Sequence, residues 1–280
     1  MTDIITKEEL YYPGAGNNSD DFIGFSFNGV RSQDLGISRV SEGTRYGEQM
    51  LPGFQDKSAQ MPGSDYTLYW ESFYNTRTWN LNIAFDHMTD AQMSLLRRTF
   101  HTKNMGNLTF AEREGIHWLA KVQAPPQLKY ICFDEDNQRI YKGEGTIQLI
   151  AYYPFGMSDL KTLSVATTGT TVTNNGEIPM EWYVIAPVTP TPSSFEIKAE
   201  TEEDTEVRIL RFNNGIEFKT GDVSFMVNSK TNLVEGLDSN NKQTGNVYNS
   251  FITAGDFFKL PVGNSKFFST GTLYYNFLYL

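Results

Sequence analysis

Cysteine is nearly absent from the sequence, which has Cys132 as its only thiol in 280 residues. One cysteine cannot form an internal disulfide, so the fold does not depend on a disulfide framework and nothing in the cysteine content indicates secretion. Long apolar runs are absent as well, and the N-terminus has neither a basic start nor an apolar stretch. The sequence predicts a protein of a reducing cytoplasm, without a signal peptide or a membrane-spanning segment.

Histidine is also scarce, since His87, His101 and His117 are the whole supply. None has a second histidine or a cysteine at the short spacing that a zinc site requires, so we expect all three on the surface or packed within strands. No Gly-x-Ser-x-Gly motif is present, and Cys132 lies within a strand pattern, where a buried and inert thiol is expected. Nucleophilic and zinc-dependent catalysis therefore have no support.

Two acidic clusters resemble sites in composition but not in spacing. Residues 134–138 begin like a calcium-binding loop, yet Arg139 stands where that loop needs glycine and Gly145 where it needs a bidentate glutamate. We interpret this cluster as an acidic hairpin turn. Residues 202–206 could supply a carboxylate pair for sugar hydrolysis, with Glu203 as a candidate, although adjacent acids in a polar stretch are more typical of a solvated loop.

The glycine pairs at positions 14 and 16 and at positions 143 and 145 do not open a helix after a strand, so they predict no phosphate-binding loop. Taken together, these patterns predict no catalytic, cofactor-binding or metal-binding residues and no cofactor. We therefore expect a structural protein and not an enzyme.

The net charge is −10, from 33 acidic and 23 basic side chains. On average such a surface repels a nucleic-acid backbone and an anionic membrane, so DNA binding is not expected. The length of 280 residues favours two domains, and the aromatic content of 14% favours half-buried strands.

The first half of the sequence has a polar, acidic segment at residues 1–21, which we expect to form an N-terminal arm. Residues 22–27 alternate into an Asn-Gly turn. Residues 41–66 are rich in Gly, Ser and Pro, which predicts a long loop or an extended excursion. Trp79 to Phe85 alternate as a half-buried strand. Further strands are expected at residues 108–110, 117–124, 128–133 and 145–153, with Pro125 and Pro126 interrupting.

One helix is expected after the strand at residues 79–85. Thr89 followed three residues later by Gln92 fits a capping box, and Met93, Leu96 and Phe100 recur on one helical face. Gly106 is the expected stop signal.

The second half begins near residues 156–163 and contains short strands at regular spacing, which is typical of a β-sandwich. These strands are expected at residues 180–185, 195–199, 206–212, 222–228, 257–260 and 271–280. Within them, Trp182 and Tyr183 could form a sugar-stacking platform, although packing in the core is the more common role of such residues.

The order of these motifs resembles the distal tail protein (Dit) family of long-tailed bacteriophages, which are of the siphovirus type. The N-terminal part of the resemblance rests on residues 25–37, 51–54, 77–85, 89–100, 108–110 and 145–156. The C-terminal part rests on residues 174–179, 220–222, 228–229 and 256–264. The resemblance covers roughly residues 22–280 and implies a mostly β fold. It divides the chain into a β-sandwich-like ring or belt domain with one helix at residues 22–160 and a galectin-like or jelly-roll β-sandwich at residues 161–280.

The same resemblance implies a structural component of the baseplate, located at the tail tip of the virion and assembled in the host cytoplasm. Its members form a hexameric ring that joins the tail tube protein and the end of the tape-measure protein to the tail-associated hub protein and the receptor-binding proteins. DNA would pass through without specific binding, and no membrane insertion is implied. The alternative is a carbohydrate-binding adhesion module that acts through the C-terminal β-sandwich.

A hexamer of this chain would carry six times −10, or −60. We expect such a ring to have an acidic lumen along which DNA slides without sticking. The long loop at residues 41–66 would then serve as a contact between subunits.

Overall fold

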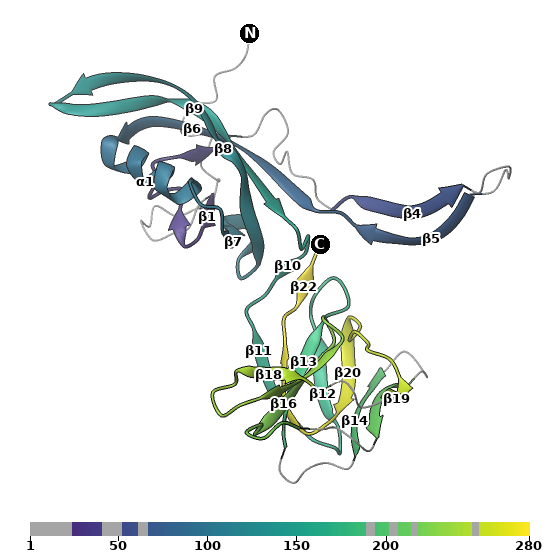
Figure 1. The fold of residues 1–280 in the computed structure, drawn as a ribbon. Helices are drawn as coiled ribbons and strands as arrows, with labels where there is room; N and C mark the ends of the chain where they lie inside the picture. The colour runs from purple at the N-terminus through teal and green to yellow at the C-terminus, as the bar shows by residue number, and fades with distance from the viewer. Residues whose placement is uncertain are drawn as a thin grey trace. The chain divides into compact units, whose positions relative to one another are not determined.

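The computed structural model describes residues 24–40, 52–60, 67–188, 194–201, 207–213, 218–247 and 252–280. The chain divides into two compact units, unit 1 with Met1–Gly156 and Leu280, and unit 2 with Met157–Tyr279. The described residues are mostly antiparallel β-sheet with a single α-helix, which confirms the predicted fold class (Figure 1). The predicted arm at residues 1–21 lies outside the described residues.

Unit 1 is built on one sheet whose strands follow the order β2-β1-β7-β8-β9-β6-β3. A separate two-stranded sheet pairs β4 with β5. The elements are β1 (Phe25–Phe27), β2 (Val30–Arg31), β3 (Ser38–Arg39), β4 (Phe54–Gln60), β5 (Thr67–Tyr74), β6 (Arg77–Thr89), α1 (Asp90–Phe100), β7 (Met105–Phe110), the 3-10 turn η1 (Ala111–Arg113), β8 (His117–Glu135), β9 (Gln138–Ala151) and β10 (Gly156–Met157).

The core of unit 1 lies on one face of this sheet, where α1 covers it. On β6 the alternation predicted from the sequence is confirmed, because Trp79, Leu81, Ile83 and Phe85 are all at most 5% exposed. Ile147 and Leu149 of β9 join the same cluster. Burial of this many large side chains at about 1.5–3 kcal/mol each is what stabilises the unit.

The helix begins as predicted. Thr89 is the N-cap, its hydroxyl accepts a hydrogen bond from the backbone N–H of Gln92 at 3.3 Å, and the Gln92 side chain accepts from the Thr89 N–H at 3.0 Å. Met93, Leu96 and Phe100 are buried against the sheet. The helix ends at Phe100, ahead of the predicted stop at Gly106, which lies inside β7.

Of the two alternatives for residues 41–66, an extended excursion fits the described part better than a loop, because β4 at Phe54–Gln60 pairs with β5 over its whole length. One expectation about unit 1 is wrong. Pro125 and Pro126 do not end a strand, since β8 runs without a break from His117 to Glu135 and absorbs the prolines in register shifts. Prolines are tolerated there because this part of β8 borders no other strand on its second side within the described residues.

Unit 2 is a β-sandwich of two antiparallel sheets. One sheet has the strand order β11-β21-β13-β16-β17-β18, and the other has the order β12-β20-β14-β15-β19. The strands of these sheets are β11 (Lys161–Val165), β12 (Thr170–Asn174), β13 (Trp182–Pro187), β14 (Ser194–Thr201), β15 (Arg208–Asn213), β16 (Ser224–Asn228), β17 (Leu233–Leu237), β18 (Gln243–Asn246), β19 (Ile252–Gly255), β20 (Gly263–Phe268) and β21 (Gly271–Tyr275). The last strand, β22 (Leu278–Tyr279), pairs with β10 and belongs to neither sheet.

Both sheets contribute alternate residues to one core, as in other sandwiches. Val184 and Phe225 come from the first sheet, and Ile197, Leu210 and Phe267 from the second; all five are fully buried. The strand expected at residues 257–260 is not formed. Leu260 instead makes an isolated bridge to Met180, in which each backbone N–H donates to the carbonyl of the other residue.

Loss of the helix cap should destabilise unit 1 measurably. Thr89→Ala removes the acceptor for the Gln92 N–H and should lower the free energy of unfolding by about 1 kcal/mol. Urea denaturation monitored by circular dichroism measures this, with Ser94→Ala on the exposed side of α1 as the control. Equal effects of the two substitutions would contradict the role of the cap.

Candidate assembly surfaces

The candidate catalytic and metal-binding residues are not brought together. His87 lies on β6 beside Asp86 and Glu135, His101 follows the last residue of α1, and His117 begins β8. Among the described residues no group of three or more His, Cys, Asp and Glu side chains is arranged to hold a metal ion. The acidic cluster at residues 202–206 lies outside the described part of the chain. In that part, no helix is long and apolar enough to cross a membrane.

The acidic cluster at residues 134–138 is a hairpin turn, as predicted. Asp134 and Glu135 end β8, Gln138 begins β9, and Asp136 and Asn137 between them have φ values of 50° and 62°. Two successive residues with positive φ form the kind of tight turn that matches the twist of the flanking strands. The cluster therefore closes a hairpin and does not surround a cation.

Cys132 is exposed, and the expectation of a buried thiol is wrong. It lies opposite Tyr141 near the tip of the β8–β9 hairpin, where β8 is the outermost strand. The local sequence pattern identifies a strand but not whether that strand is central or at the edge of a sheet, and this difference decides the exposure of the thiol.

The proposed sugar-stacking platform is not available on Trp182, which is 2% exposed and packs against Phe258 and Phe267 in the sandwich core. Tyr183 points to the other side of its strand and stacks on Tyr274, with ring centroids 4.7 Å apart and nearly parallel rings. Partial burial raises the pKa of the Tyr183 hydroxyl. Of the two aromatic residues, the larger one is therefore a core residue.

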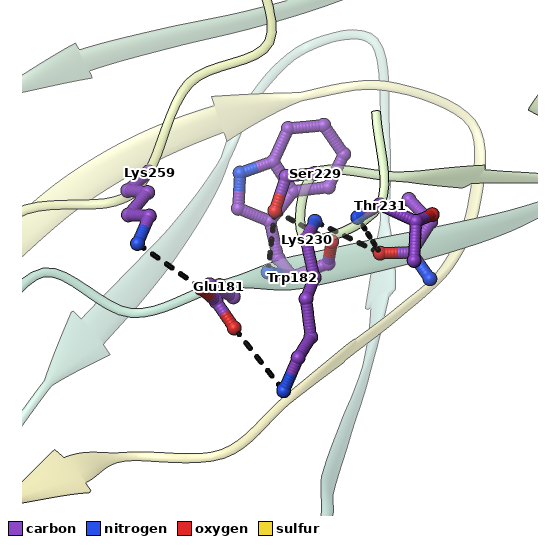
Figure 2. A network of polar contacts seen from close by, with 7 residues as sticks. Glu181, Trp182, Ser229, Lys230, Thr231 and Lys259 are labelled. Carbon is purple, nitrogen blue, oxygen red and sulfur yellow. Dashed lines mark hydrogen bonds and ion pairs between the residues drawn. The ribbon is translucent and has the colours of Figure 1, made fainter. Parts of the chain in front are cut away.

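A polar network beside Trp182 ties three segments of unit 2 together (Figure 2). The Glu181 carboxylate, 15% exposed, lies 3.0 Å from Lys259 Nζ and 3.5 Å from Lys230 Nζ. Ser229 Oγ accepts a hydrogen bond from the Trp182 backbone N–H and donates one to its carbonyl, both at 2.8 Å. With its charge paired and its backbone groups satisfied, this network has the properties of a structural brace.

The distal part of β8, from Ala124 to Glu135, is the first candidate surface. β7 pairs with β8 only as far as Lys121, whereas β9 accompanies it to the turn. One side of the distal segment thus has no strand partner among the described residues. An edge of this length offers unpaired N–H and C=O groups to another chain, except at Pro125 and Pro126, which lack an N–H.

Apolar side chains on the same segment are exposed to solvent. Ile131 is 64% exposed, Tyr130 44% and Phe133 37%. Three large apolar residues within four positions of an edge strand are unusual for a surface that stays in water. We therefore interpret the distal part of β8 as an interaction surface.

The inner side of this hairpin is held against the start of α1. Tyr141 of β9 donates a hydrogen bond to Asp90 Oδ1 at 2.5 Å, and the carboxylate, together with burial, raises the pKa of the Tyr141 hydroxyl. Tyr130 packs edge-on against Tyr141, with centroids 5.5 Å apart. The hairpin is therefore braced on one face, and its outer edge is presented in a fixed position.

The β4–β5 ribbon is the second candidate surface. Phe54 is 62% exposed, Tyr69 60% and Phe73 44%, so apolar groups lie on a sheet of only two strands. Such a ribbon is marginally stable in water by itself. Its base is secured by an aromatic contact between Tyr74 and Phe155, with centroids 4.9 Å apart, which leaves the rest of the ribbon available to a partner.

Comparison of the sequence with known protein families and with curated proteins gives no match. Comparison of the fold with solved structures does find a similar protein. The crystal structure of Dit (gp 19.1) of phage SPP1 aligns over 92% of this chain and 99% of its own, with 12% sequence identity and a TM-score of 0.58. This chain has the fold of a phage distal tail protein. The resemblance predicted from the sequence is confirmed at the level of the fold.

SPP1 Dit is described as a paradigm of the hub adsorption apparatus in phages that infect Gram-positive bacteria. Two structures of the phage p2 baseplate in its activated conformation, with Ca and with Sr, each align over 89% of this chain and 92% of their own. Their sequence identities are 8% and 7% and their TM-scores 0.44 and 0.42, which do not define a shared fold.

Sequence analysis did not predict the exposed aromatic residues of either surface. In β4 the glycine- and proline-rich surroundings indicated a loop or an extended excursion. In distal β8 most side chains are exposed, so no alternation of apolar and polar residues is imposed. The usable signal was weaker. Tyr130, Ile131 and Phe133 stand in a short apolar run directly before an acidic turn, which is typical of a projecting hairpin.

The exposed position of Cys132 predicts rapid labelling of the native chain. A water-soluble disulfide reagent should modify one thiol per chain at the rate of an unfolded control, because access and not unfolding limits the reaction. Release of the coloured thiolate, with and without denaturant, measures both rates. Labelling that required denaturant would show that Cys132 is buried after all.

Proposed function

We propose that this protein is a structural distal tail protein of a long-tailed phage, forms a hexameric ring at the tail tip and joins the tail tube to the baseplate hub and receptor-binding proteins. The observation that carries the proposal is the fold shared with SPP1 Dit over almost the whole of both chains. The proposed role is mechanical and needs no catalytic residue.

Ring formation is supported by two different open edges on the sheet of unit 1. The distal part of β8 is one edge, and the other lies on β6, where β3 pairs only with Ile83 and Ala84 among the described residues. Pairing of unlike edges between copies is a heterologous contact. Such contacts generate a closed ring when the rotation between copies closes, so six copies can continue one sheet around an axis.

The exposed apolar residues would be covered in this assembly. Ile131 and Phe133 border the β8 edge, and Phe54 and Tyr69 lie on the β4–β5 ribbon. Burying large apolar side chains contributes about 1.5–3 kcal/mol each, which is the order needed to hold repeated contacts together. The described part of the predicted intersubunit segment at residues 41–66 is residues 52–60, which include β4 of this ribbon.

We propose that unit 2 is a separate β-sandwich of the galectin-like type. We infer that the ring contacts the tail tube and the end of the tape-measure protein on one side and the hub and receptor-binding proteins on the other. Assembly would take place in the host cytoplasm, and DNA would cross the ring without sequence-specific contacts.

Native mass spectrometry of the full-length chain tests the ring directly. A hexamer of a 31.8 kDa chain has a mass of about 191 kDa, and this species should dominate at micromolar concentration. A chain that remains monomeric both alone and with its tail-tube partner would contradict the proposal.

Charge placed on the β8 edge should prevent assembly. Ile131→Glu with Phe133→Glu introduces two carboxylates where a neighbouring strand would bury them. The concentration at which the ring dissociates by half should rise at least 10²-fold, and each tenfold rise corresponds to about 1.4 kcal/mol. Leu160→Glu, at an exposed apolar residue of unit 2, is the matched control and should leave the hexamer intact. An unaffected double variant would place the interface elsewhere.

A further inference from the structure

The face of the unit 1 sheet opposite α1 has an unusual composition. Along β6 its residues are Thr78, Asn80 and Asn82, along β9 they include Thr146 and Gln148, and on β8 Gln127 continues it. We call these six residues the amide face. Thr78, Asn80 and Gln127 are exposed and the other three are half-buried, so the face is open to solvent.

Strand register shows that these side chains form continuous rows. Asn80 lies opposite Gln148, while Asn82 lies opposite Thr146, and Thr146 in turn lies opposite Gln127. Residues directly opposite one another on antiparallel strands point to the same face. Thr146 Oγ1 also donates a hydrogen bond to Asn82 Oδ1 at 3.0 Å, which links two strands across the row.

No carboxylate is present on the amide face, although the chain has ten more acidic than basic side chains. Lys121 lies opposite Ile150, which lies opposite Thr78, so one cation stands in the row of Thr78 at this end of the face. At the other end, in the row next to Thr146 and Gln127, Lys129 lies opposite Glu144, and beyond it Lys142 Nζ lies 2.8 Å from Asp86 Oδ1. The six residues of the amide face themselves therefore contribute nothing to the negative charge of the protein.

We propose that the amide face is the wall of the DNA passage and that its partner is the phosphate backbone of a duplex in transit. The inference rests on the proposed ring. If the open edges of β8 and β6 pair between copies, the sheet closes into a barrel, and the face covered by α1 and the core must lie outside. The opposite face then lines the lumen.

A wall of amides and hydroxyls suits a polyanion that has to pass without stopping. Lysines would hold the phosphates through release of bound counterions, and carboxylates would repel them in a confined passage. Neutral amides do neither, and they exchange hydrogen bonds with water and phosphate at little net cost. This replaces the acidic lumen expected from the net charge with a neutral one.

Lysines added to this wall should trap linear DNA and not circular DNA. Asn80→Lys with Gln148→Lys places about twelve cations around a hexamer, whereas Thr171→Lys with Thr173→Lys adds the same charge to two exposed positions of unit 2. The probe is a fluorescent linear duplex, with covalently closed circular DNA as competitor, which cannot thread a closed ring. Binding is followed by fluorescence anisotropy at two salt concentrations.

The expected result is tight binding of the linear duplex to the Asn80→Lys, Gln148→Lys ring, falling by roughly 10³-fold or more between about 50 and 200 mM salt. Circular DNA should compete poorly with it. The unit 2 variant should bind linear and circular DNA alike, and the wild-type ring should bind neither.

Several outcomes would overturn the inference. Equal competition by circular DNA would show that the lysines lie on an outer surface. Loss of the hexamer in this variant and in Thr78→Lys with Gln127→Lys would show that the face is buried in a protein interface. A wild-type chain that is monomeric with its tail-tube partner would overturn the ring itself, whereas the first two results leave the ring in place.

Discussion

The antiparallel pairing of β8 with β9 is the interaction on which the rest of unit 1 depends. The ladder extends from Lys121 opposite Ile150 to Glu135 opposite Gln138, and β9 pairs with β6 on its other side. An edge strand satisfies its backbone groups on one side only. The pairing that builds the core therefore also leaves the distal edge of β8 without a strand partner among the described residues, so that stability and the proposed assembly would depend on one element.

Sequence reasoning succeeded where burial follows a single period. Trp79 to Phe85 alternate because one face of β6 meets the core, and Thr89 with Gln92 marks the helix start by local chemistry. It did not decide between a loop and an extended excursion for β4, because the exposed side chains of this strand carry no such period and its partner strand is β5, later in the chain. The alternation of apolar and polar residues reflects which side chains are buried. A strand that buries few side chains in the isolated chain therefore shows only a weak alternation.

The candidate surfaces depend on strand order, which a local pattern does not contain. Cys132 stands in a strand-like run, and its exposure follows only once β8 is known to be the outer strand of the hairpin. The same holds for Trp182 and Tyr183, neighbours of similar character that point to opposite faces of β13. The sequence indicates that one of two adjacent aromatic residues is buried, while the pairing register decides which one.

Net charge and local charge would have different consequences for the proposed ring around DNA. The total of −10 per chain governs solubility and long-range repulsion. A duplex inside a passage lies within one Debye length, about 8–10 Å, of the wall, and carboxylates on distant surfaces are screened from it. In the proposed ring, the surface that the duplex meets is then set by Asn80, Gln148 and their neighbours and not by the composition of the chain. An acidic protein can in this way present an uncharged surface to DNA. This is possible because a β-strand places successive side chains on opposite faces, so the residues of one face can differ in charge from the rest of the protein.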